Sequence, residues 1–200
     1  MSKIKRILII ICVALSLNSC DELAQMLNQV NEIVNLKNCN FDVSGISNIN
    51  MLGINLSNGM DKTDLTASQL IKVTNSLLQK KLPVTFNVNI DVDNPNSIAA
   101  SLGKMDYIIG LNGNQIISST FNQGFSIPAM SNGSIAIPIS TDLFQLFSGE
   151  TADAILNLAF KLAGAQSDPV NLGVQVKPYI TINNQQLAYP DYITIDKVLE

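Results

Sequence analysis

Residues 84–93 carry the clearest alternation of apolar and polar residues in the chain. The apolar set comprises Val84, Phe86, Val88, Ile90 and Val92. Because successive side chains of a strand point to opposite faces, this pattern predicts a strand with one face in the core and one in water. The strand is expected to end at the turn signal Asn94-Pro95-Asn96, since proline removes a ladder donor and asparagine favours turns.

Shorter alternating segments predict further strands. They lie at 39–44, with extended chain continuing at 49–56, and at 105–111, 115–120, 125–127, 135–139, 170–176 with its continuation at 180–182, and 192–195. Asn112-Gly113 predicts a hairpin turn, because both residues tolerate a positive φ. Gly53 is a candidate bulge position, and Pro138 suggests a sheet edge. Cys39 is in phase with the core face of the first strand, so we expect a buried, unreactive thiol.

Three segments change to the three- and four-residue spacing of amphipathic helices. The segment 66–80 begins with a capping box, Thr66 with Gln69. Its helical face is made of Leu70, Ile71, Thr74, Leu77 and Leu78. A helical insert is expected near 142–164 and a leading helix at 21–37. The leading helix either packs on the domain or presents a docking stripe to a membrane or a partner.

About seven to nine strands with a leading helix, a helix near 66–80 and a helical insert near 142–164 predict a mainly β protein. The arrangement expected is an antiparallel β-sandwich. No linker rich in Gly, Ser or Pro divides residues 38–200, which predicts one domain. A hydrophobic content of 46% with 14% charged residues fits a well-packed globular domain.

The first twenty residues have the pattern of a bacterial lipoprotein leader. Basic residues precede an apolar run of 11 residues at 7–17, and Leu17-Asn18-Ser19-Cys20 follows. A bilayer span needs about 20 apolar residues, so this run predicts a cleaved signal peptide at 1–19. Cys20 would then carry lipid, and 20–37 would be a tether helix.

Lipidation at Cys20 would make a membrane the first partner of the protein. The expected location is the bacterial cell envelope, most strongly the outer membrane. The acidic pair Asp21-Glu22 leaves open the choice between inner and outer membrane, and between the periplasmic face and the surface, because that choice depends on the host.

Composition excludes several function classes. The chain has no His and no Trp, and Arg6 is its single Arg. Without His there is no Ser-His or Cys-His nucleophile pair and no imidazole metal ligand. Removal of the leader leaves nine Lys against 16 acidic residues, a formal charge of −7, which predicts no nucleic-acid binding. No catalytic residue, cofactor or metal is predicted, and Cys39 would be left without a disulfide partner.

The best candidate for a ligand site is the end of the main strand. Asp91, Asp93, Asn94 and Asn96 offer hard oxygen donors within six residues, as calcium prefers. The same residues also suit an exposed strand face and a turn, and EF-hand spacing is absent. The four residues are therefore a weak candidate binding site. A carboxylate pair of Asp91 with Asp106 is a second arrangement, but the sequence indicates no cleft that would shift their pKa values.

Residues 84–140 resemble the late-embryogenesis-abundant type 2 family (LEA-2), also called the WHy domain. The resemblance is carried, in order, by 88–96, 102–107, 111–113, 125–128 and 135–139. It implies a fibronectin-III-like or immunoglobulin-like sandwich, an association with desiccation and stress protection, and no catalytic activity. The leader and the insert at 142–164 depart from the minimal family domain.

Three function classes follow. The preferred one is a non-enzymatic envelope lipoprotein whose LEA-2-like domain is a structural or binding module for an envelope protein or glycan. The alternative is a carrier that holds a lipid or other apolar ligand within the sandwich. The third is a stress protectant acting on membranes or proteins. An apolar cavity beneath the 142–164 helices would favour the carrier, and a fully packed core would disfavour it.

Overall fold

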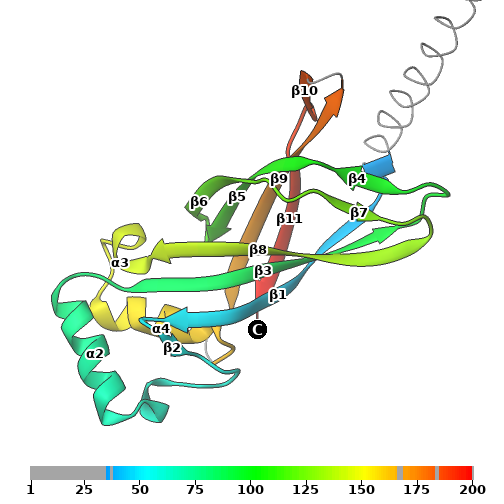
Figure 1. The fold of residues 1–200 in the computed structure, drawn as a ribbon. Helices are drawn as coiled ribbons and strands as arrows, with labels where there is room; N and C mark the ends of the chain where they lie inside the picture. The colour runs from blue at the N-terminus through cyan, green and yellow to red at the C-terminus, as the bar shows by residue number, and fades with distance from the viewer. Residues whose placement is uncertain (1–34, 37, 166–168, 183–184, 200) are drawn as a thin grey trace, which may run out of the picture.

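The computed structural model describes residues 35–36, 38–165, 169–182 and 185–199. Within them the chain folds as two antiparallel sheets that enclose one core (Figure 1), which confirms the predicted β-sandwich. The predicted signal peptide, Cys20 and residues 21–34 of the predicted leading helix lie outside the described residues.

The four-stranded sheet has the order β2-β1-β3-β8, and all its pairs are antiparallel. The strands are β1 (Asn40–Met51), β2 (Ile54–Asn55), β3 (Pro83–Asn94) and β8 (Ser131–Asp142). The predicted alternation of β3 is confirmed, since the side chains from Val84 to Val92 on its apolar face are all buried. β8 is the last strand of the order, which confirms the edge predicted at Pro138.

The five-stranded sheet has the order β10-β9-β5-β6, with β11 also paired to β9. Its strands are β5 (Lys104–Leu111), β6 (Asn114–Phe121), β9 (Val170–Ile182), β10 (Gln185–Ala188) and β11 (Ile193–Leu199). The hairpin predicted at Asn112-Gly113 joins β5 to β6, with φ values of 49° and 79°. A small sheet of β4 (Ala100–Leu102) and β7 (Phe125–Ile127) lies near the end of the sandwich opposite α2 (Figure 1).

Gly53 is not at a bulge. It forms a two-residue turn with Leu52 between β1 and β2, and both residues have positive φ, 56° for Leu52 and 78° for Gly53. Glycine adopts this conformation without steric cost, and Asn50 Oδ1 accepts a hydrogen bond from its N–H at 2.7 Å. The irregularities of β1 occur earlier instead, where its register against β3 shifts after Val43 and after Ser47.

The predicted helical insert is confirmed as α3 (Leu143–Leu146) and α4 (Ala152–Leu162). α4 begins at the cap Thr151 and buries most of its apolar side chains in the core. The buried set comprises Ile155, Leu156, Leu158, Ala159, Phe160 and Leu162. None of the helices that the structure describes is long and apolar enough to cross a membrane.

The helix predicted at 66–80 is α2 (Ala67–Leu78), which follows a 3₁₀ turn, η1 (Lys62–Asp64). Its capping box is confirmed: Gln69 N–H donates to Thr66 Oγ1, and Thr66 N–H donates to Gln69 Oε1. Val73, not the predicted apolar face, makes the buried contact with the body of the protein. Most of the predicted face is turned to solvent instead.

Candidate functional site: the outer face of the five-stranded sheet

The four residues predicted as a weak binding site do not converge on one point. Asp91 and Asp93 lie on the outer, exposed face of β3, whereas Asn94 is fully buried. Asn40 Nδ2 donates a hydrogen bond to Asp93 at 3.2 Å. Among the residues described, no three acidic or cysteine side chains are close enough to share a metal ion.

Asn94 holds two loops together. Its Nδ2 donates to the backbone carbonyls of Ile98, Ile127 and Pro128 at 2.9–3.1 Å. Its Oδ1 accepts from the backbone N–H and the side-chain amide of Asn96. Asn96 also donates to Asn35 O at 2.9 Å, which fixes the first described residues to the same loops. The side-chain amides of Asn94 and Asn96 therefore hold loops of the fold together.

Cys39 lies beside Asn94, where its Sγ is 3.6 Å from Asn94 Oδ1. The thiol is buried, as predicted. Burial raises its pKa, and the negative charge of Asp93 raises it further. Because the thiolate is the reactive form, this environment keeps the side chain inert at neutral pH.

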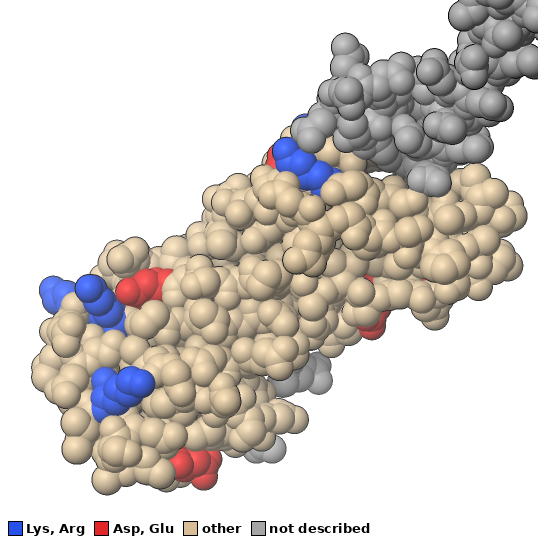
Figure 2. Space-filling view, viewed as in Figure 1, with Lys and Arg blue, Asp and Glu red and all other residues tan. Residues whose placement is uncertain are grey.

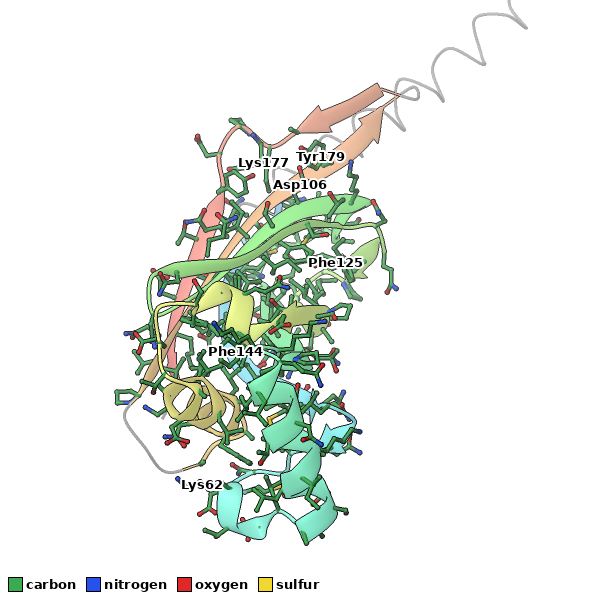
Figure 3. All side chains as sticks on the ribbon, turned by 90° about the vertical axis from the view of Figure 1, so that its left-hand side faces the viewer. Lys62, Asp106, Phe125, Phe144, Lys177 and Tyr179 are labelled. Carbon is green, nitrogen blue, oxygen red and sulfur yellow. The ribbon has the colours of Figure 1, made fainter. Side chains whose placement is uncertain are left out.

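The outer face of the five-stranded sheet carries a different set of functional groups, which sequence reasoning missed. Along β5 it presents Lys104, Asp106, Ile108 and Gly110, and along β9 it presents their partners Tyr179, Lys177, Gln175 and Gly173. A polar and aromatic cluster therefore lies at one end of this face, and two glycines meet at the other. Figure 3 shows Asp106, Tyr179 and Lys177 near one another on this sheet.

Asp106 is the centre of the polar cluster. Thr120 Oγ1 donates to its Oδ1 at 2.7 Å, and the Tyr179 hydroxyl donates to its Oδ2 at 2.6 Å. These two hydrogen bonds, Tyr179 first, lower the pKa of Asp106, and the charges of Lys104 and Lys177 lower it further. The hydrogen bond to Asp106 correspondingly raises the pKa of Tyr179.

Cations stack on the aromatic rings of this cluster. Lys104 Nζ lies 4.8 Å from the ring centroid of Tyr179, and Lys177 Nζ lies 5.6 Å from that of Tyr192. Asp106 stays ionised and both its oxygens are engaged, so it is a poor proton donor or acceptor at neutral pH. The cluster has the chemistry of a recognition surface, not of an acid–base pair.

The other end of the face is hollow. Gly110 on β5 is paired with Gly173 on β9, so neither strand projects a side chain there. An open depression of about 570 Å³ results, and its lining includes Ile108, Gln115, Asn171, Gln175, Asp196 and Val198. Lys197 also lines the hollow. Apolar walls with amide groups, one carboxylate and one ammonium group suit a polar ligand or a polypeptide segment.

A sequence signal for this hollow exists. Gly110 and Gly173 each interrupt a run of strand-forming residues at an outward position. Glycine inside a strand often marks a place where a ligand or another backbone approaches closely. The pairing of the two glycines depends on the β5–β9 register, which joins segments more than sixty residues apart.

One family model matches the middle of the chain. Residues 89–185 match the family model of LEA_2, late embryogenesis abundant protein. The LEA_2 match agrees with the resemblance seen in residues 84–140, and it contains both Gly110 and Gly173. α2 and β11 lie outside the LEA_2 match. No curated protein matches the chain significantly.

Three solved structures are similar to the chain. A protein from Archaeoglobus fulgidus has 13% identity, with 59% of this chain and 83% of that chain covered, at a TM-score of 0.32. A protein from Arabidopsis thaliana, solved in solution, has 13% identity, with 60% of this chain and 72% of that chain covered, at a TM-score of 0.40. A protein named as a candidate late embryogenesis abundant (LEA) protein has 11% identity, with 91% of this chain and 82% of that chain covered, at a TM-score of 0.36.

Proposed function

We propose that this chain is a non-enzymatic lipoprotein of the bacterial cell envelope. Its lipid anchor is Cys20, and its LEA-2-like sandwich is a binding module for an envelope protein or glycan. The outer face of the five-stranded sheet is the binding surface. The observation that carries the proposal is the hollow over Gly110 and Gly173, next to the cluster of Asp106 and Tyr179.

The hollow supports binding because β5 and β9 both have glycine at the same pair, so neither strand fills the space with a side chain. A hollow that opens onto solvent and is lined by amide groups, one carboxylate, the Lys197 side chain and aliphatic walls suits a ligand held by hydrogen bonds and contact area. The stacked Lys104 and Tyr179 offer a second contact area for the same partner.

The absence of enzymatic activity is proposed on two grounds. The sequence has no His, and its single Arg lies in the leader. Asp106 has a lowered pKa, and each of its oxygens already accepts a hydrogen bond. The LEA_2 match favours the same conclusion.

The envelope location is proposed from the leader pattern that ends at Cys20. The outer membrane is the preferred membrane. A contribution to desiccation or stress protection is the second part of this proposal, and the LEA_2 match supports it. In this account protection results from binding an envelope partner, so the protective effect stops increasing once all of that partner is bound.

The carrier function is less well supported. Large side chains fill the space between the sheets, among them Phe86, Ile90, Met105 and Ile109. A depression of about 360 Å³ does lie beside α4, but it is open and includes Asn112, Glu150 and Lys161 in its lining. An apolar ligand would meet charged and amide groups there.

Photo-crosslinking tests the proposed surface. A photoreactive residue at Gln175, on the rim of the hollow, is compared in intact envelopes with one at Asn87 on the outer face of the opposite sheet. We expect one saturable adduct from Gln175, none from Asn87, and loss of the adduct in Gly173→Val, which fills the hollow. Equal labelling from both positions, or an adduct that survives Gly173→Val, would overturn the proposed surface.

A further inference from the structure

α2 carries an apolar stripe that faces water. Leu70, Ile71 and Leu78 are 48%, 62% and 78% exposed, whereas Val73 on the inward side is 1% exposed. At 3.6 residues per turn, the exposed positions Ala67, Leu70, Ile71, Thr74 and Leu78 fall within an arc of about 100°. Single exposed aliphatic residues are common on soluble proteins, but a contiguous set on one helix marks an interaction site.

Lysines lie close to this stripe, although the whole chain has a net charge of −4. Lys72 lies on α2, and Lys80 and Lys81 follow the helix directly; all three are exposed. Figure 2 shows basic side chains at the α2 end of the molecule, with acidic side chains beside them. A lysine stem can lie along apolar surface while its ammonium group stays in water.

Acidic residues near this surface are occupied by the backbone. Asp61 and Asp64 form the capping box of η1, where each accepts a backbone N–H. Asp142 accepts the N–H groups of Leu82 and Phe144 at 2.8 and 3.0 Å. Backbone N–H donors thus hold each of these carboxylates in place.

We propose that α2 with Lys80 and Lys81 is a docking surface for an anionic lipid bilayer. Leu70, Ile71 and Leu78 enter the boundary between headgroups and acyl chains, and the lysines contact the anionic headgroups. The exposed side chains project from a convex helix, so they can enter a deformable lipid layer without a complementary groove. The lysine charge complements anionic lipid and selects it over neutral lipid.

The position of α2 gives this surface a separate role. It precedes the LEA_2 match, and Figure 1 places it at the end opposite residues 35–36. Docking by α2 does not depend on the proposed anchor at Cys20. In a chain that is also anchored there, α2 would provide a second lipid contact, away from the point where the N-terminal segment joins the sandwich.

Vesicle flotation of the proposed mature chain, residues 20–200, carrying Cys20→Ala tests the proposal, because neither the basic and apolar leader nor a lipid anchor then contributes. Vesicles of phosphatidylcholine alone are compared with vesicles of phosphatidylcholine mixed with phosphatidylglycerol, at low and high salt. We expect binding to the anionic vesicles, weakened by salt. The triple variant Leu70→Gln/Ile71→Gln/Leu78→Gln, and separately Lys80→Gln/Lys81→Gln, should each lower the partition coefficient about tenfold or more.

Matched controls lie elsewhere on the surface. Ile98 and Met130 are 46% and 75% exposed outside α2, and their double change to Gln should leave binding unchanged. Because the substituted leucine, isoleucine, methionine and lysine side chains are all exposed, thermal unfolding should stay the same.

Equal binding to neutral vesicles, an equal loss in the controls, or no vesicle binding at all would overturn the proposal. The last result would indicate a protein partner for the stripe. None of these outcomes bears on Cys20, so failure of this docking surface and failure of the lipoprotein proposal can be told apart.

Discussion

The hydroxyl of Tyr179 on β9 donates a 2.6 Å hydrogen bond to Oδ2 of Asp106 on β5. The two residues are 73 positions apart in the sequence. In the β5–β9 register Tyr179 is opposite Lys104 and Asp106 is opposite Lys177, so the hydrogen bond joins neighbouring pairs on the same face. The same carboxylate accepts from Thr120 on β6. One half-buried carboxylate thus connects three adjacent strands of the proposed binding face.

The Asp106 network predicts a pH-dependent effect of Tyr179→Phe. The hydrogen bonds lower the pKa of Asp106 in the folded protein, so they stabilise the fold above the pKa of an unfolded Asp, about 3.9. This stabilisation is lost as the pH falls through the folded pKa. In urea unfolding, the variant should be less stable than the wild type at about pH 7, and the difference should shrink as the pH falls below about 3.9. A difference that is constant with pH would contradict this assignment.

Substitution of Asn94 should lower the free energy of unfolding more than substitution of most other polar residues. Asn94→Ala leaves several backbone carbonyls and the Asn96 N–H without their partner in a fully buried site. We expect a loss of about 2–4 kcal/mol in the free energy of unfolding, measured by urea titration. Asn132→Ala, an exposed change on β8, is the control and should alter stability by less than about 0.5 kcal/mol. Similar values for both variants would show that the loop contacts of Asn94 do not stabilise the fold.

The orientation of α2 can be tested by stability alone. Val73→Ala removes a buried side chain and should cost about 1–3 kcal/mol. Leu78→Ala removes a larger side chain from an exposed position and should change the free energy of unfolding by less than about 0.5 kcal/mol. Thermal or chemical unfolding measures both. A larger cost for Leu78→Ala would mean that the predicted apolar face packs inward after all.

Cys39 should resist alkylation in the folded protein. Burial and the charge of Asp93 raise its pKa, which lowers the thiolate fraction at neutral pH. With iodoacetamide at about pH 8, peptide mass mapping should show labelling of Cys39 at least about tenfold slower in the native chain than in urea. Mapping separates Cys39 from Cys12 and Cys20. Equal rates in both conditions would place the thiol at an accessible site.

Patterns of local origin were predictable from the sequence. The alternation at Val84–Val92 defined the central strand because a strand half in the core imposes a period of two. Asn112-Gly113 defined a hairpin because its backbone conformation suits few other residues. The same alternation puts Asn94 in phase with Val92, so its burial was implied by the pattern, although its turn chemistry suggested a surface ligand.

Features that depend on distant pairing were not predictable. Periodicity defined α2 but not the side that packs, because Val73 rather than Leu70 meets the body of the protein. The hollow needs Gly110 to meet Gly173, and the polar cluster needs Asp106 to meet Tyr179. Both require the β5–β9 register, which no local pattern contains.

The most direct test of the central claim is the intact mass and membrane fractionation of the native protein beside a Cys20→Ala variant. The account predicts a mass equal to residues 20–200 plus acyl chains, recovery in the membrane fraction, and loss of both acylation and membrane recovery in the variant. An unacylated chain that still begins at Met1, or a native distribution that Cys20→Ala leaves unchanged, would contradict it.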